Sequence, residues 1–194
     1  TGIDMWIVIS REYNEDPVLK TMLPAEWLNA RRRTILVFYH NPQTKTVERL
    51  AVARYDFGKN IKAAWDTQKY PEQWDALIAI VKQRNPQKIG INTSMHFGHA
   101  DGLDYTEHQE LMQKLPVEFK SRTVSAEPLA IRWLETRTTR EMQFYPQLIN
   151  ATHKIIEEGF SEKVITPGIT TSEDVVWWFR QKIRDLGYDT WFHP

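Results

Sequence analysis

The sequence predicts one α/β domain joined to the opening helices of a second domain, on the basis of three observations. Residues 3–10 form a nearly continuous apolar run with the length and β-branched content of a strand buried on both faces. Residues 71–133 alternate between helix-like apolar stripes and short strand-like runs, which is the order of an α/β domain. Residues 137–194 carry two helical patterns that each begin with a capping-box spacing. The first domain is expected at residues 1–136 and a second, incomplete one at residues 137–194.

The elements of the first domain follow from apolar periodicity and turn residues. Strands are predicted at residues 3–10, 34–39, 47–53, 88–92 and 122–126. Helices are predicted at residues 24–29, 71–84, 105–115 and 127–133. Asn41-Pro42-Gln43-Thr44 supplies turn chemistry between the second and third strands, which predicts an antiparallel hairpin. Trp74, Leu77 and Val81 form the stripe of a helix that leads into the next strand, as in a βαβ-like crossover.

Three consecutive arginines, Arg31–Arg33, follow the expected helix at residues 24–29, which would carry Pro24 in its first turn. They could clamp a carboxylate, although cations placed at the negative C-terminal end of a helix are the simpler interpretation. His40, beside the hairpin turn, and His153, on a predicted helix, are interpreted as exposed structural residues.

Two capped helices are predicted in the second domain. Thr138 and Glu141 have the Thr-x-x-Glu spacing of a capping box ahead of a long apolar stripe. Pro146 lies within this stripe, so it either kinks the helix or marks its true start. After the turn Thr166-Pro167-Gly168, the run Thr170-Thr171-Ser172-Glu173 repeats the capping-box spacing, and Gly187 is expected to end the second helix.

The two helices of residues 137–194 carry more apolar surface than 58 residues can bury among themselves. We therefore expect the sheet that covers them to be formed by sequence beyond this chain. Trp177 and Trp178 could form a stacking platform for bases or proline rings, but their helical spacing favours core packing.

Residues 93–103 are the segment best suited to function, because they combine two glycines with small and polar residues and lack both helix and strand periods. The densest set of possible metal ligands lies there and just beyond: His96, His99, Asp101, Asp104, Glu107 and His108. Their spacing matches neither the zinc-peptidase patterns nor a calcium loop. Three interpretations stay open: an autonomous metal site, a solvated loop, or a loop that reaches toward a substrate pocket, including one in a partner subunit.

Composition excludes several classes of partner. Lys plus Arg and Asp plus Glu both number 25, so the chain has no net field to attract nucleic acid or an anionic membrane. No apolar run approaches the roughly 20 residues that span a bilayer, and the first residues lack the pattern of a secretion signal. Cysteine is absent, which removes disulfides and thiolate chemistry but leaves the compartment, cytoplasmic or exported, open.

The second domain resembles the entry into the pita-bread domain of the creatinase, prolidase and Xaa-Pro aminopeptidase superfamily. The resemblance is carried by the capped helix that starts at residues 137–141, the turn Pro167-Gly168-Ile169-Thr170, and the second capped helix at residues 173–186. Residues 4–19 and the Ala-Asp-Gly-Leu run at residues 100–103 are similar to a bacterial Xaa-Pro peptidase subgroup. The resemblance implies a creatinase-type N-terminal domain, with a mixed β-sheet flanked by helices, followed by the first two helices of a truncated pita-bread domain.

The resemblance also implies a hydrolase that cleaves the bond before proline in peptides with proline at the second position. Members of the superfamily hold two divalent ions, here expected to be manganese, cobalt or zinc, on two Asp, one His and two Glu of later strands. No metal ligand or catalytic residue is therefore assigned in this chain, which is expected to be inactive alone. His96, His99, Asp101 and His193 are predicted to lie near substrate in the complete protein, which is expected to be a homodimer or higher homo-oligomer.

Two rival functions belong to the same superfamily. Some of its members lack metal ligands and bind peptides or proteins, and others are creatinase-like enzymes that hydrolyse a C–N bond of a small guanidino compound with histidines that transfer protons. In the leading hypothesis, residues 1–136 serve oligomerisation and the screening of substrate length.

Overall fold

The computed structural model describes residues 1–190, and His193 lies outside the described residues. The chain divides into two compact units, Thr1–Thr136 and Arg137–Pro194. Among the helices of the described residues, none has the length and hydrophobicity needed to cross a bilayer.

The first unit contains a mixed sheet. Within the described residues it has six strands: β1 (Met5–Arg11), β2 (Arg33–His40), β3 (Val47–Ala51), β4 (Lys62–Ala63), β5 (Ile89–Ile91) and β6 (Thr123–Ser125). Their order across the sheet is β4-β3-β2-β1-β5-β6. β2 pairs antiparallel with β1 and β3, which confirms the predicted hairpin, whereas β5 pairs parallel with both β1 and β6. The α/β fold predicted from the sequence is confirmed.

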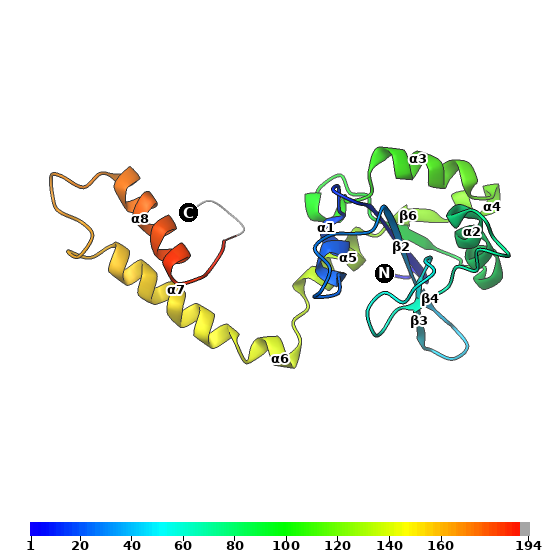
Figure 1. Ribbon diagram of the computed structural model, residues 1–194, viewed down its shortest axis with the longest axis horizontal. Coiled ribbons are helices and arrows are strands. Elements are labelled where there is room, and N and C mark those ends of the chain that lie inside the picture. Colours follow the sequence, from blue (N-terminus) through cyan, green and yellow to red (C-terminus); the bar gives the residue numbers. More distant parts are fainter. Residues whose placement is uncertain (191–194) are drawn as a thin grey trace. The chain divides into compact units, whose positions relative to one another are not determined.

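Helices cover both faces of this sheet (Figure 1). They are α1 (Pro17–Met22), α2 (Gln73–Arg84), α3 (Tyr105–Lys114), α4 (Val117–Lys120), α5 (Glu127–Glu135) and the short 3-10 helix η1 (Gly98–Ala100). α2, α3 and α4 pack on one face and α1, η1 and α5 on the other. Strand β1 is central and buried on both faces, as its uninterrupted apolar run predicts, because its alternate residues serve the two cores.

The helix predicted at residues 24–29 is wrong. Residues 24–29 form turns, and the helix lies earlier, at α1. The Asp16 carboxylate accepts hydrogen bonds from the backbone N–H groups of Val18 and Leu19, and Pro17 occupies the first helical turn. An Asp-Pro pair at this position is a strong helix start, because the carboxylate satisfies free N–H groups and proline needs no hydrogen bond there.

The second unit consists of α6 (Thr139–Met142), α7 (Tyr145–Gly159) and α8 (Ser172–Asp185) in its described part. The capping box of Thr138 and Glu141 is confirmed. Pro146 lies in the first turn of α7 and so marks the start of that helix, where its missing N–H costs nothing.

The second capping box lies one residue later than its predicted position. Thr171 and Asp174 form it, with Asp174 N donating to Thr171 Oγ1 at 3.2 Å and Thr171 N donating to Asp174 Oδ2 at 2.9 Å. Thr170 is occupied elsewhere, because its hydroxyl accepts a hydrogen bond from Thr166 N at 2.8 Å and closes the preceding turn. Glu173 therefore lies in the first helical turn instead of completing the box.

An apolar groove of about 920 Å³ runs along α7 and α8. Leu148, Ile156 and Phe179 are among the side chains that line it. Trp178 is half-buried and packs edge-on against Phe179, as core packing requires, but Trp177 is 60% exposed and lies under the guanidinium of Arg180. Much of the apolar surface of this unit is therefore uncovered in the described residues.

We predict that two isoleucines of α7 differ sharply in their effect on stability. Ile155 is 9% exposed and Ile149 is 53% exposed. Ile155→Ala should lower the free energy of unfolding of this unit by about 2 to 3 kcal/mol, because it empties a packed site, whereas Ile149→Ala should change it little. Hydrogen exchange of the α7 amides in the two variants measures the difference. Equal losses would show that Ile149 is also buried in solution.

Candidate functional site

A buried hydrogen-bond relay joins the centre of the sheet to the start of α1. Trp6 Nε1 donates to Asn92 Oδ1 at 2.7 Å, and Asn92 Nδ2 donates to Asp16 Oδ2 at 2.8 Å. Asp16 Oδ1 accepts the two backbone N–H groups that begin α1, and Asp16 N donates to Ser10 Oγ at 2.9 Å. The end of β1, the start of α1 and the distant residue that follows β5 therefore meet around one carboxylate.

The relay also fixes the loop that follows β5. Leu103 N donates to Asn92 O at 3.0 Å, which closes the loop of residues 93–102 onto its own start. Gly102 packs directly on the relay, because a Cβ added there would overlap the Asp16 carboxylate and lie 2.7 Å from Pro17 Cδ. The Ala-Asp-Gly-Leu run at residues 100–103 thus has a packing role, with Ala100 and Leu103 buried.

Asp16 is a fully buried carboxylate with no cationic partner among the described residues. Burial raises its pKa above the ordinary value, while the hydrogen bonds from Asn92, Leu19 and Val18 act in the opposite direction. The cost of removing the charge from water is the larger effect.

Hydroxyl groups shape the loop on the outer side of the relay. Ser94 Oγ accepts hydrogen bonds from His96 N at 3.1 Å and Phe97 N at 2.8 Å, and it donates to Glu127 Oε2 at the start of α5. Asp101 Oδ1 accepts from Ser94 N at 3.0 Å. Ser94 therefore joins both ends of the loop to α5.

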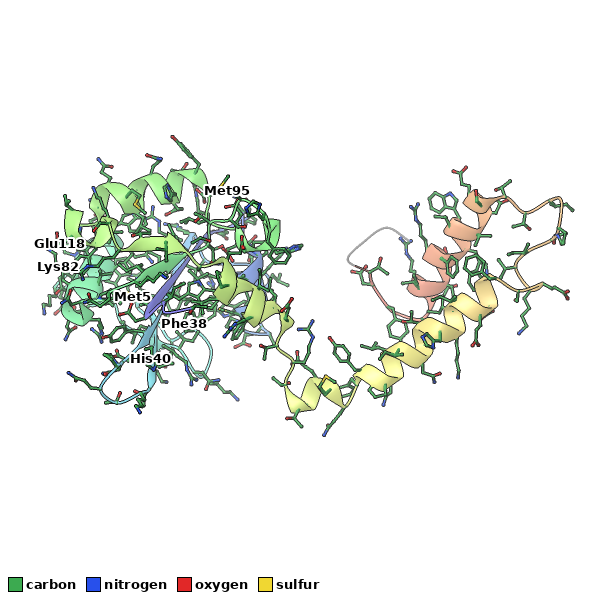
Figure 2. All side chains as sticks on the ribbon, turned by 180° about the vertical axis from the view of Figure 1, so that it is seen from behind. Met5, Phe38, His40, Lys82, Met95 and Glu118 are labelled. Carbon is green, nitrogen blue, oxygen red and sulfur yellow. The ribbon has the colours of Figure 1, made fainter. Side chains whose placement is uncertain are left out.

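A cleft of about 540 Å³ opens beside this loop, along β5 and β6. Its lining includes His96 and Asp101 together with Lys88, Ser125 and Glu127. Two of the residues predicted to lie near substrate thus share one cleft. Figure 2 shows Met95, in the same loop, at the opposite end of the sheet from His40 at the end of β2.

The other two predicted residues are placed differently. His99 is exposed on η1, with its ring 5.7 Å from that of Phe97, and it does not line the cleft. The prediction for His193 falls outside the described residues. A role near substrate remains a prediction for all four residues.

The six possible metal ligands of residues 96–108 are not brought together. Asp104 caps α3 by accepting from Glu107 N at 3.0 Å, and Glu107 is buried in an ion pair. Within the described residues, no group of three or more His, Asp or Glu side chains has an arrangement that could hold a metal ion. An autonomous metal site in this loop is therefore not supported by the geometry.

Arg33 departs from the expectation of a solvated arginine run. Its Nε lies 2.7 Å from Glu107 Oε2, its Nη2 lies 2.8 Å from Glu110 Oε2, and its guanidinium stacks 4.7 Å from the centre of the Trp74 ring. The pKa of Glu107 is raised, first by burial and against the opposing effect of Arg33. Arg31 and Arg32 remain exposed. Arg33, at the start of β2, thus joins this strand to α3 through two ion pairs.

Several residues of the site escaped sequence analysis. Asp16 had a usable signal, since an Asp-Pro pair before an apolar run predicts a helix start. Asn92 and Glu127 had none, because their partners Asp16 and Ser94 lie 76 and 33 residues away and only the folded sheet brings them together. Lys88 begins a predicted strand, and that position carries no signal of a cleft residue.

Comparison of the fold with solved structures gives a match to an Xaa-Pro dipeptidase from Bacillus anthracis. The TM-score is 0.50 at 15% sequence identity, and the match covers 93% of this chain and 45% of the neighbour. The chain thus spans less than half the length of that protein. No family model and no curated protein sequence matches the chain. At this identity the likeness shows the fold alone, and the mixed sheet flanked by helices is consistent with the creatinase-like fold of the neighbour.

We predict that Gly102→Ala destabilises the first unit by about 2 kcal/mol, because the added methyl group would displace a carboxylate held by hydrogen bonds and a rigid proline ring. Gly98→Ala is the matched control, since a Cβ there meets nothing within 4 Å. Urea unfolding of both variants measures the effect. Equal stability of the two variants would contradict the close packing of Gly102 on the relay.

A second prediction concerns pH. Because the pKa of Asp16 is raised in the folded state, its contribution to stability is complete below the ordinary Asp pKa and is lost as pH rises through the folded value. Asp16→Asn removes this titration. It also places an amide N–H group opposite the N–H group of Asn92, which then loses its acceptor. The variant should therefore be less stable, with a deficit that is largest near pH 4 and narrows toward pH 7. Urea unfolding across this range tests the sign, and a deficit that widens with pH would refute it.

Proposed function

We propose that the chain is the N-terminal, non-catalytic region of a proline-specific metallopeptidase. In this proposal residues 1–136 are its creatinase-like domain and residues 137–194 begin its pita-bread domain. The observation that carries the proposal is the fold likeness to an Xaa-Pro dipeptidase over 93% of the chain. The motifs around residues 137–141, 167–170 and 173–186 support the same family independently of the fold.

The uncovered groove of the second unit supports the assignment of this unit as the start of a larger domain. Apolar residues from both α7 and α8 line it over about 920 Å³. Isolated helices gain little from propensity alone and need a packed apolar face. The remainder of the catalytic domain is proposed to supply the covering layer.

The two divalent ions of such a peptidase have no ligand set in the described residues. Residues 1–190 therefore do not fit the metal centre, and no chemical step is assigned to them. Their proposed work is to select and orient the peptide and to hold subunits together in a homo-oligomer. The cleft containing His96 and Asp101 is the proposed contact with peptide.

The test compares the 194-residue chain with a longer polypeptide that includes the residues encoded after Pro194. We expect only the longer protein to release alanine from Ala-Pro-Ala or from the dipeptide Ala-Pro in the presence of manganese, and to lose that activity when a chelator is added, because the metal ligands are proposed to lie in the added part. Release of free alanine measures it, with Ala-Ala-Ala as the control peptide.

Three outcomes would contradict the proposal. Hydrolysis by the 194-residue chain at a comparable rate would place the chemistry within it. Peptide binding by the longer protein without hydrolysis would favour a binding module. Turnover that survives the chelator, on a guanidino compound instead of the peptide, would favour the creatinase-like C–N hydrolase.

A further inference from the structure

The cleft beside β5 and β6 has opposite charges at its two ends. Glu127 and Asp101 lie at the end where β5 and β6 finish, and Lys88 lies just before the first residue of β5. Strands advance about 3.3 Å per residue, so the three steps from Lys88 to Ile91 alone separate the two ends by about 10 Å. Ile3, Val124 and Pro128 line the same cleft and give it apolar surface.

None of these charges is compensated within the described residues. Each carboxylate accepts one hydrogen bond from Ser94, and neither Glu127 nor Asp101 has a Lys, Arg or His nitrogen within 4.0 Å there. Lys88 Nζ makes a long hydrogen bond to the carbonyl of Thr1, at 3.4 Å, and has no carboxylate partner in the same part of the chain. Charges left in this state favour a ligand that carries both signs.

The wall that carries the carboxylates is already ordered. Ser94 ties Glu127 to the loop, Ser125 Oγ accepts from Glu127 N at 3.1 Å, and Ser125 Oγ also donates to Thr93 O. The loop itself is closed on the buried relay through Asn92 and Leu103. A ligand would therefore meet a fixed wall, which lowers the entropic cost of binding.

We propose that this cleft binds a short peptide whose two ends are free, with the α-ammonium at Glu127 and Asp101 and the α-carboxylate at Lys88. Extended peptides lengthen by about 3.3 Å per residue, so three to five residues span the charges and a dipeptide does not. The inference rests on the proposed function and adds to it a site, outside the catalytic domain, that selects peptides by their free ends and their length.

The experiment uses the ¹⁵N-labelled 194-residue chain and follows the amide signals of Ser94 and Ser125 during titration with Ala-Pro-Ala-Ala. The same peptide with an acetylated N-terminus, the same peptide with an amidated C-terminus, and the dipeptide Ala-Pro complete the set. We expect the unmodified tetrapeptide to bind best, and each blocked end to weaken binding by about three- to fivefold, as loss of one partly exposed charge pair does.

Two variants test which end of the peptide each charge contacts. Glu127→Gln should reduce the difference in affinity between free and acetylated peptide, because Asp101 remains as the second carboxylate and Gln can still accept the Ser94 hydrogen bond. Lys88→Met should reduce the difference in affinity between free and amidated peptide. Lys82→Met and Glu118→Gln are matched controls, because these exposed residues lie on α2 and α4, which cover the other face of the sheet (Figure 2). Both control variants should still bind the free peptide more tightly than the acetylated and the amidated peptides.

The proposal is overturned if the Ser94 and Ser125 signals do not move at about 20 mM peptide, or if all peptides bind equally. It is also overturned if Glu127→Gln and Lys88→Met distinguish free from end-blocked peptides as strongly as the unaltered chain does. None of these results bears on proline-specific hydrolysis by the longer protein, so the two proposals fail separately.

Discussion

The first unit depends on one buried carboxylate. Asp16 makes four hydrogen bonds. Its carboxylate accepts from Asn92 Nδ2 and from two backbone N–H groups of α1, and its own backbone N–H donates to Ser10 Oγ. Removing a charge from water without a counter-ion is costly, and these hydrogen bonds offset only part of that cost. The carboxylate thereby fixes the start of α1 and the exit from β5 in a single arrangement.

The candidate site follows from that arrangement. Because the Asn92 side chain is hydrogen-bonded to both Trp6 and Asp16, the loop after β5 leaves the sheet at a fixed point. Ser94 then holds the start of the loop to α5, and the side chains of His96 and Asp101 reach the same cleft. The buried relay thus positions the polar wall of the cleft on which the proposed peptide contact depends.

The second unit combines locally capped helices with an apolar face that is largely uncovered in the described residues. Capping boxes define where α6 and α8 begin, because they satisfy free N–H groups locally. Local capping does not bury apolar surface, however, and the α7 and α8 groove remains open in the described residues. The unit is therefore well defined as a set of helices while its apolar face still lacks a partner, which is the situation expected for the start of a larger domain under the proposed function.

Local patterns in the sequence determined most of the elements: the buried strand β1, the β2 and β3 hairpin, the α2 stripe, and the cap at Thr138 all depend on neighbouring residues alone. Where two local signals competed, the one with the better local hydrogen bonds decided. Asp16 with Pro17 placed a helix that Pro24 alone had suggested later in the chain, and Thr170 was diverted into a turn so that capping passed to Thr171. The relay, the Arg33 ion pair and the cleft depend on residues that only the sheet brings together, because pairing across strands has no fixed sequence separation from which it could be read.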